Sequence, residues 1–198
     1  MKKSMKHALA VMMLLTLTIA LSGCSGDKAS DSSQIVVGIP QDLEDSLDPH
    51  VAVAAGTKEV LFNIYEGLVK PDSDGNLIPA VASEYAVSED EKTFTFTLRE
   101  GIKFHNGNPV TVEDVKYSIE KCADTTDGDP LVEAYSNIER IETPDERTIE
   151  IVLTEPNNDF LSYMTTAILP ANQTSSETEP IGTGPYMYVS RSPQENFV

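Results

Sequence analysis

The stretch from Thr93 to Cys122 constrains the fold of this chain more than any other part of its sequence. Its first residues alternate between apolar and polar, and the apolar members are Phe94, Phe96 and Leu98. A period of two predicts a strand with one buried face. A turn rich in Gly, Asn and Pro follows, and apolar residues then recur at helical spacing, as Val112, Val115 and Ile119. The stretch therefore predicts a strand, a turn and a helix in that order.

The start of this helix can be predicted closely. Thr111 stands where an N-cap residue is expected, and Asp114 follows three residues later in the capping-box position. The helix should therefore begin at Thr111 or Val112.

Other local elements follow from similar patterns. A short β-branched run at 35–39 is typical of a strand buried on both faces. Residues 57–69 and 158–168 show helical periodicity, with Thr57 as a cap of the first. The segments 138–141 and 148–153 predict a β-hairpin, and residues 186–189 predict a strand. Helical and strand patterns mix irregularly, so the predicted class is α/β or α+β without a regular repeat.

Charge narrows the range of partners. The net charge is −18, and three of the basic residues (Lys2, Lys3 and Lys6) lie at the N-terminus, so the remainder is still more acidic. Phosphate binding needs clustered Lys and Arg, so this chain is not expected to bind nucleic acid. An acidic surface also disfavours anionic lipids, and any membrane attachment must therefore come from another source.

Such a source is visible in residues 1–24. Basic residues precede an apolar run from Ala8 to Leu21, which is too short to span a bilayer comfortably but has the length of a signal-peptide core. The run ends in Leu21-Ser22-Gly23-Cys24, which resembles a bacterial lipobox. Residues 1–23 are predicted to be a lipoprotein signal peptide, and Cys24 is predicted to carry lipid, palmitate included. The alternative is an ordinary secretory signal with a chance cysteine.

Lipid on Cys24 would leave Cys122 without a disulfide partner. Cys122 is predicted to be a half-buried, small apolar residue of the helix and not a reactive thiol. Residues 25–33 are polar and form a tether.

No catalytic constellation can be identified. His50 and His105 lie in unrelated turns without the spacing of a zinc helix, and both are interpreted as surface or hydrogen-bonding residues. The run 72–76 resembles a calcium loop but lacks its closing Glu, so a plain turn is predicted. The glycines at 182 and 184 are a poor phosphate cradle and instead allow a close backbone approach or a positive φ. We predict no enzyme, no cofactor and no metal site; a secreted hydrolase would need catalytic residues that the sequence does not offer.

Eight landmarks then occur in a fixed order. They are the lipobox, Leu47-Asp48-Pro49, Ile64-Tyr65-Glu66-Gly67-Leu68, Gly75-Asn76-Leu77-Ile78-Pro79-Ala80, Phe94-Thr95-Phe96-Thr97-Leu98-Arg99, Ile102-Lys103-Phe104-His105-Asn106-Gly107, Val110-Thr111-Val112-Glu113-Asp114-Val115 and Gly182-Thr183-Gly184-Pro185-Tyr186. The ordered set resembles the N-terminal portion of a family 5 extracytoplasmic solute-binding protein, the lipoprotein subunit that serves peptide, oligopeptide and nickel ABC importers.

The resemblance implies a type II periplasmic-binding-protein-like α/β fold of the peptide-binding subclass, with an extra subdomain. The chain is expected to be incomplete, with the second lobe missing. Residues 24–34 would be the lipidated Cys24 and tether, residues 35–50 and 171–198 part of lobe I, and residues 51–170 the extra subdomain. The implied protein is a monomer that captures peptides, or nickel complexes or similar solutes, and delivers them to permease subunits. It would be exported and lipid-anchored to the outer face of the cell membrane, or periplasmic if the envelope has two membranes.

The resemblance also implies site residues. The loop after Leu47-Asp48-Pro49 would border the ligand cleft, which gives the candidates His50, Val51, Ala52, Val53 and Ala54. The second set, at the hinge or lobe crossing, is Gly182, Thr183, Gly184, Pro185 and Tyr186.

A clamp needs ligand contacts on two faces, so this chain alone is expected to bind solute weakly or not at all. The alternative is a truncated interaction lipoprotein without a transport role.

Overall fold

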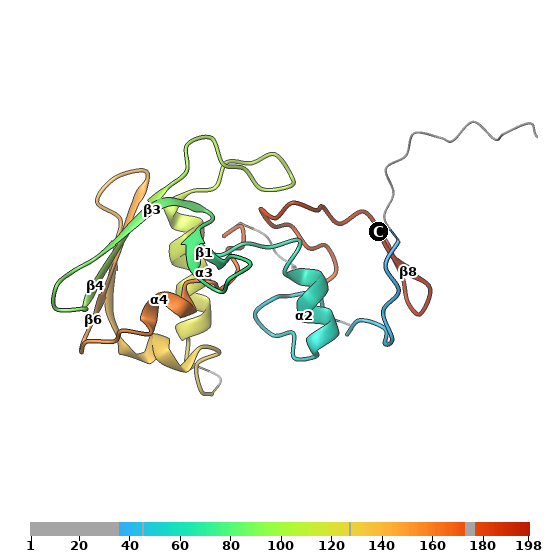
Figure 1. The fold of residues 1–198 in the computed structure, drawn as a ribbon, viewed down its shortest axis with the longest axis horizontal. Helices are drawn as coiled ribbons and strands as arrows, with labels where there is room; N and C mark the ends of the chain where they lie inside the picture. Colours follow the sequence, from blue (N-terminus) through green and yellow to red (C-terminus); the bar gives the residue numbers. More distant parts are fainter. Residues whose placement is uncertain (1–35, 45, 127, 173–176) are drawn as a thin grey trace, which may run out of the picture. The chain divides into compact units, whose positions relative to one another are not determined.

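The computed structural model describes residues 36–44, 46–126, 128–172 and 177–198, and Ile39–Val198 form one compact unit. The predicted signal peptide and Cys24 lie outside the described residues. In chain order the elements are α2 (Ala55–Leu61), β1 (Val69–Pro71), β2 (Leu77–Pro79), β3 (Ala82–Val87), β4 (Thr93–Leu98), α3 (Val112–Ala123), the 3-10 helix η1 (Glu133–Asn137), β5 (Ile138–Glu142), β6 (Thr148–Leu153), α4 (Phe160–Tyr163), β7 (Arg191–Ser192) and β8 (Asn196–Phe197) (Figure 1).

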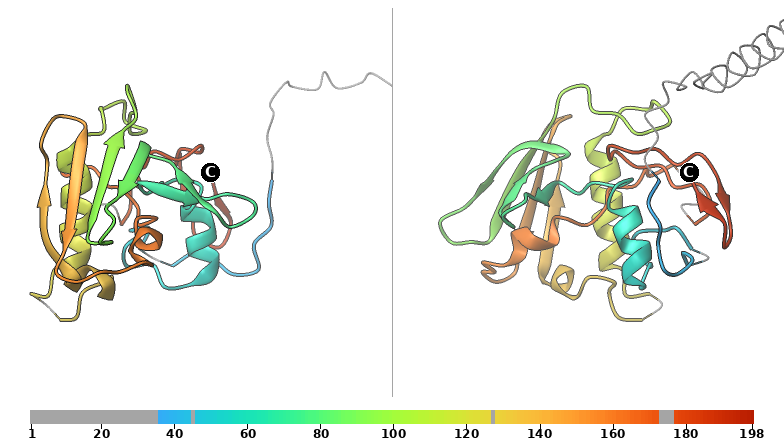
Figure 2. Two further views of the ribbon diagram at one scale, coloured as in Figure 1. Left: turned by 60° about the vertical axis from the view of Figure 1, so that its left-hand side comes forward. Right: turned by 45° about the vertical axis from the view of Figure 1, so that its right-hand side comes forward.

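The main sheet has four antiparallel strands in the order β3-β4-β6-β5 (Figure 2). The predicted alternation of β4 is confirmed, since Phe94, Phe96 and Leu98 are buried while the threonines between them are half-buried. Phe94 lies opposite Ile151 and Phe96 opposite Ile149, so two strands supply one apolar face. The predicted β5–β6 hairpin is also confirmed.

Helix α3 begins at Val112, as predicted. The Thr111 hydroxyl accepts a hydrogen bond from the Asp114 N–H, and the Asp114 carboxylate accepts one from the Thr111 N–H at 2.9 Å. These reciprocal bonds satisfy amides that no helical carbonyl could reach. The apolar stripe of α3, which includes Cys122, packs against the sheet in the main core.

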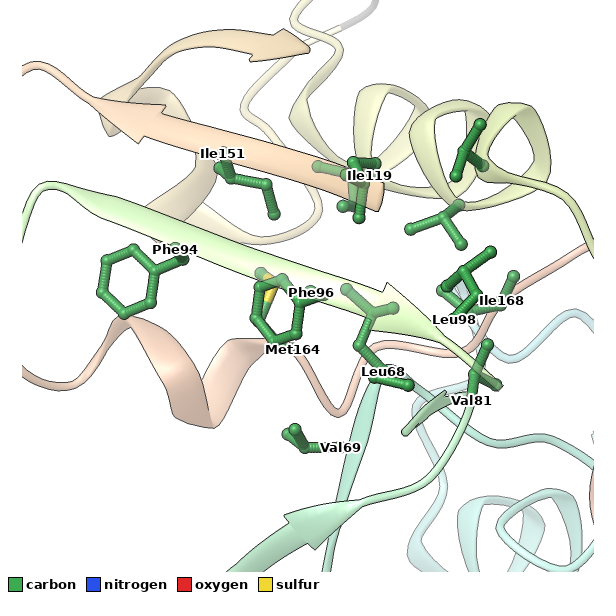
Figure 3. Close-up of a cluster of buried hydrophobic side chains, with 14 of the residues drawn as sticks. Leu68, Val69, Val81, Phe94, Phe96, Leu98, Ile119, Ile151, Met164 and Ile168 are labelled. Atoms are coloured by element: carbon green, nitrogen blue, oxygen red, sulfur yellow. The ribbon is translucent and has the colours of Figure 1, made fainter. Parts of the chain in front are cut away.

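Figure 3 shows how this core is filled. Side chains of β4 lie beside Ile119 from α3 and Ile151 from β6, with Leu68, Val69, Met164 and Ile168 around them. Phe94 also packs on Phe160 of α4, with ring centroids 5.0 Å apart. The core therefore joins the sheet and α3 to chain segments well outside them.

The helix predicted at 57–69 is wrong in its length and in its cap. Helix α2 ends at Leu61, and Thr57 is buried inside it, where its hydroxyl accepts a hydrogen bond from the Glu44 N–H at 3.1 Å. The backbone beyond Leu61 pairs with distant segments: Ile64 O accepts from the Gly184 N–H at 2.8 Å, and Gly67 O from the Val81 N–H at 3.1 Å. Those partners replace the next helical turns.

The helix predicted at 158–168 is also too long, because α4 covers only Phe160–Tyr163. Phe160, Met164 and Ile168 are buried and Leu161 is half-buried, but the backbone after α4 pairs elsewhere. Met164 O accepts from the Val69 N–H at 3.2 Å, and the Ile168 N–H donates to Glu66 O at 3.0 Å. Gly67 permits this close approach, since a Cβ there would lie 2.5 Å from Met164 O.

Two predicted strands do not form in the described residues. Residues 36–39 are exposed, with Val36 83% and Val37 76% accessible, and no described strand pairs with them. A strand buried on both faces needs neighbours that this part of the chain does not provide. Residues 186–189 likewise form no strand, and the short β7–β8 pair follows them.

The plain turn at 72–76 is confirmed, as it joins β1 to β2. Asp72 Oδ1 accepts from the N–H groups of Asp74 and Asn76, both at 2.9 Å. Within the described ranges no helix has the length and apolar character needed to cross a bilayer.

Candidate functional site

The first candidate segment, residues 50–54, is organised by Asp48. Its Oδ1 accepts a hydrogen bond from the His50 N–H at 2.9 Å, and its backbone carbonyl accepts from Val51 and Ala52. Its Oδ2 lies 2.6 Å from Lys121 Nζ of α3. Asp48 is only 5% exposed, so one buried carboxylate shapes the turn and anchors it to a helix.

Glu44 fixes the end of the same segment. Its Oε2 accepts from the N–H groups of Val53 at 2.9 Å and Ala54 at 3.2 Å, immediately before α2. The side chains then sort by burial: Ala52 is buried, whereas Val51 and Val53 are 43% and 76% exposed. The segment thus presents two apolar side chains outward from a backbone that is held in place.

His50 turns inward. Its Nε2 lies 2.8 Å from Ala167 O, and because a carbonyl can only accept, this nitrogen carries the proton. The other ring nitrogen, Nδ1, is buried without a hydrogen-bond partner in the described residues. Burial lowers the pKa of His50; the Ala167 carbonyl and the Asp48 carboxylate oppose that effect, and the Lys121 ammonium adds to it.

A cavity of about 280 Å³ lies beside this histidine. We call it the His50 cavity, and it is lined by Pro49, His50, Lys58, Leu61, Phe62, Tyr65, Cys122, Val132, Thr165, Thr166 and Ala167. Burial, with the Asp48 carboxylate, raises the pKa of the Tyr65 phenol, so this group stays protonated. The cavity therefore offers apolar walls, hydroxyl groups and one lysine at its lining.

Cys122, which also lines the cavity, is fully buried at 1% exposure and not half-buried as predicted, because it belongs to the apolar stripe of α3 that packs in the main core. Burial raises the pKa of its thiol to about 12, so the thiolate that nucleophilic chemistry requires is not formed at neutral pH. Among the residues that the structure describes, no group of three His, Cys, Asp or Glu side chains is placed to hold a metal ion.

The second candidate segment, residues 182–186, is held against residues 63–65. A Cβ at Gly182 would lie 2.1 Å from Ile64 O, and one at Gly184 would lie 2.5 Å from Asn63 O. Only glycine fits at these two positions, which confirms the predicted close backbone approach. Tyr186, in contrast, is 60% exposed.

His105 secures this segment from the other side. Its Nε2 lies 2.9 Å from Gly184 O, and its Nδ1 accepts the Gly182 N–H at 3.3 Å. The Gly182 carbonyl accepts the His105 N–H at 2.9 Å. Both histidines are therefore hydrogen-bonding residues, in agreement with the sequence prediction.

Both candidate segments lie close to Tyr65. Tyr65 lines the His50 cavity, and its ring would also contact a Cβ at Gly182. Sequence reasoning missed the residues that connect these parts, chiefly Lys121, Tyr65 and the 165–167 segment. One signal for Lys121 was present, because Asp114, Ser118 and Lys121 recur at helical spacing beside the apolar stripe.

The solved structures that this fold resembles are periplasmic binding proteins. AgaA from Agrobacterium tumefaciens R10, in complex with agropinic acid, is 34% identical with a TM-score of 0.67, and the match covers 74% of this chain and 31% of that one. The Escherichia coli murein tripeptide binding protein MppA is 27% identical with a TM-score of 0.71, covering 79% and 36%. The fold is thus the α/β type II periplasmic-binding-protein class.

The sequence comparisons name the family. The profile of the bacterial extracellular solute-binding proteins, family 5 Middle, matches residues 76–198. The dipeptide-binding protein DppE of Bacillus subtilis (strain 168) is 30% identical over 93% of this chain, and the glutathione-binding protein GsiB of Escherichia coli (strain K12) is 30% identical over 91%. The chain belongs to this family of solute-binding proteins, as its landmarks predicted.

The chain spans 40% of the length of DppE and 36% of that of GsiB. These relatives are solute-binding proteins and not enzymes, and family membership supports export. The relatives DppE and GsiB also favour the prediction of a solute-binding protein over the alternative of an interaction lipoprotein without a transport role.

Proposed function

We propose that this chain is part of the extracytoplasmic substrate-binding component of an ABC importer. The component captures a solute outside the cytoplasm and delivers it to permease subunits, while other subunits hydrolyse ATP, so the chain itself is not an enzyme. The observation that carries the proposal is the family match over residues 76–198, together with relatives that are 30% identical across nine-tenths of the chain.

Peptides are the proposed solute class. DppE is named for dipeptides, and OppA of Haemophilus influenzae, 25% identical with a TM-score of 0.71, was solved with the peptide RPPGFSPFR. Extended peptides bind through backbone hydrogen bonds and pockets for side chains. The exposed valines at 51 and 53, together with the cavity that His50 lines along with hydroxyls and a lysine, suit that mixture of apolar and polar contacts.

Residues 50–54 are proposed to border the solute cleft, and residues 182–186 to serve at the hinge or lobe crossing. The fixed turn at Asp48 supports the first assignment, because a preorganised segment loses little entropy when a solute binds. The glycine contacts with residues 63–64 support the second assignment, since they join two distant parts of the chain tightly.

Membrane attachment through lipid on Cys24 is also proposed, with residues 1–23 removed as a signal peptide. The support is the lipobox sequence. Intact-mass measurement of the protein from its host should give the mass of the chain from Cys24 onward plus lipid. A C24S variant should instead be released in soluble form, and a membrane-bound C24S protein would contradict the lipid anchor.

The test of the transport proposal uses the product of the complete open reading frame that contains these residues, purified without lipid. Calorimetry with defined dipeptides, tripeptides and pentapeptides should show binding with a dissociation constant in the micromolar range or below, by a monomer. The isolated 198-residue chain should bind the same peptides weakly or not at all. Absence of binding by the complete product across all three peptide lengths would contradict the peptide assignment.

A further inference from the structure

Helix α3 carries a polar stripe beside its apolar one. Asp114, Ser118 and Lys121 are spaced four and three residues apart and so lie on one face. Asp114 and Ser118 are 7% and 0% exposed, and the Lys121 side chain is 28% exposed. Buried polar groups on a helix need partners outside it, and the stripe finds them in two distant segments.

The first partner is the segment 169–171. Asp114 Oδ1 accepts the Ala171 N–H at 2.8 Å, and Ser118 Oγ accepts the Leu169 N–H at 2.8 Å. This backbone segment thus follows the helix for one turn, with side-chain acceptors in place of a neighbouring strand.

The second partner is Asp48. Lys121, one turn beyond Ser118, donates to Asp48 Oδ2 at 2.6 Å. His50 Nε2, in the same turn as Asp48, lies 2.8 Å from Ala167 O and so connects this turn to the chain just before Leu169. The stripe therefore ties α3, the 167–171 segment and the turn at 48–50 into one hydrogen-bonded unit.

We propose that Lys121 is a positioning residue for the solute-facing segment 50–54 and acts through Asp48. The inference rests on the proposed function, because it assigns a role in solute binding. The Asp48 carboxylate that receives the Lys121 ammonium also receives the His50 N–H, so the cation and the turn share one group. Without the ammonium, a carboxylate that is 5% exposed loses the charge that Lys121 supplies, and its hold on the turn becomes weaker.

Helix α3 therefore has two roles. Its apolar stripe stabilises the sheet core, whereas its polar stripe sets where residues 50–54 lie relative to that core. Lys116, on the same helix, provides a matched control. It pairs with Glu120 at 3.9 Å, and the Glu120 side chain is 59% exposed, so this pair is solvated and fixes no turn.

The first measurement is amide hydrogen exchange on the 198-residue chain. Lys121→Met, which keeps most of the aliphatic stem, should speed exchange of the His50, Val51 and Ala52 amides by about tenfold. The amides of β4 should change little. Lys116→Met should leave both groups unchanged. Unchanged exchange at residues 50–52 in Lys121→Met would overturn the proposal.

A compensating variant distinguishes positioning from simple packing. Asp48→Asn removes the charge that Lys121 balances but keeps an oxygen for the His50 N–H. In the Lys121→Met background it should restore slow exchange at residues 50–52 at least in part. If the lysine stem mattered only for packing, Asp48→Asn would restore nothing, and that result would overturn the proposal. Should Lys121→Met alone fail to fold, the double variant is compared directly with wild type.

The second measurement is peptide affinity in the product of the complete reading frame, with the peptide that wild type binds most tightly in the panel above. Lys121→Met should weaken binding about tenfold, the double variant should recover part of it, and Lys116→Met should bind as wild type does. Faster exchange with unchanged affinity would overturn the role in solute positioning while solute binding itself stands. A wild-type protein that binds no peptide would overturn the proposed function and this role together.

Discussion

Two regions of the molecule are held together in different ways. The sheet region, residues 69–166, has a four-stranded ladder and a capped helix around a large apolar core. Among its described residues, the α2 region (39–68 and 167–198) has one short helix, the two-residue strands of the β7–β8 pair and a small cluster of buried apolar residues (Leu43, Leu47, Ala52, Leu61, Ile64, Tyr65 and Leu169). Single polar contacts supplement this sparse regular structure.

Arg191 is an example of the single polar contacts that stabilise the α2 region. Its guanidinium donates to Glu44 O at 2.7 Å and Leu43 O at 2.6 Å, and the Gln194 N–H donates to Asp42 Oδ2 at 2.9 Å. One side chain thus joins parts of the chain that are far apart in sequence. Both candidate segments, residues 50–54 and 182–186, lie in the α2 region, so the candidate site depends on such individual contacts.

The largest expected effect lies in the sheet region. Phe96→Ala removes a fully buried ring from β4 and should lower the free energy of unfolding by about 3–5 kcal/mol, because it loses apolar contact and leaves a cavity. Urea unfolding followed by circular dichroism measures this loss. Thr95→Ala, on the other face of the same strand, is the control. Equal effects of the two changes would contradict the one-sided core.

The next effect should appear in the α2 region. Gly182→Ala places a Cβ against the Ile64 carbonyl, so the backbone must separate there, at a cost of about 1–3 kcal/mol. Hydrogen exchange should accelerate at the Gly184 and Tyr186 amides, which donate to residues 63 and 64, before it does in the sheet. Gly56→Ala, with open space around its Cβ, should be neutral or slightly stabilising. A sheet that loosens first would contradict the separation of the two regions.

A smaller effect is expected at the helix cap that serves both regions. Thr111→Ala removes the hydroxyl that accepts the Asp114 N–H and should cost about 1 kcal/mol. Thermal unfolding measures it, with Thr111→Ser as the control that keeps the hydroxyl. A Ser variant as unstable as the Ala variant would show that the methyl group matters and not the cap.

The smallest effect is a dependence on pH in the α2 region. Burial holds the pKa of His50 below its ordinary value, so its contribution to stability is present above about pH 6.5 and declines as the pH falls and the unfolded state takes up the proton. Whatever the size of the shift, a group with an unfolded pKa of about 6.5 can lose no more than about 1.4 kcal/mol at pH 5.5. Exchange at Ala52, corrected for its intrinsic pH dependence, measures it. The His50→Gln variant should lack this response, and a response that persists would assign it to another group.

The sequence was most informative where the forces are local. The alternation of Phe94, Phe96 and Leu98 and the Thr111–Asp114 cap involve residues that are close along the chain, so their pattern predicts strand β4 and the start of α3 directly. The family landmarks, read in order, predicted the class that the comparisons then gave. Cys122 was likewise predicted to be unreactive from its place on the apolar stripe.

The conformation of residues 62–68 and the pairing of Lys121 with Asp48 depend on tertiary contacts that the sequence pattern does not predict. Residues 62–68 continue a helical period, yet their carbonyls accept N–H groups from residues 81, 168 and 184, and no local rule predicts those partners. Helical and long-range hydrogen bonds compete for these carbonyls. The long-range N–H donors come close enough to bind only once the chain has folded, so the sequence pattern alone cannot predict the outcome. The pairing of Lys121 with Asp48 has the same origin: the sequence placed both charges, and only the fold brought them to within 2.6 Å.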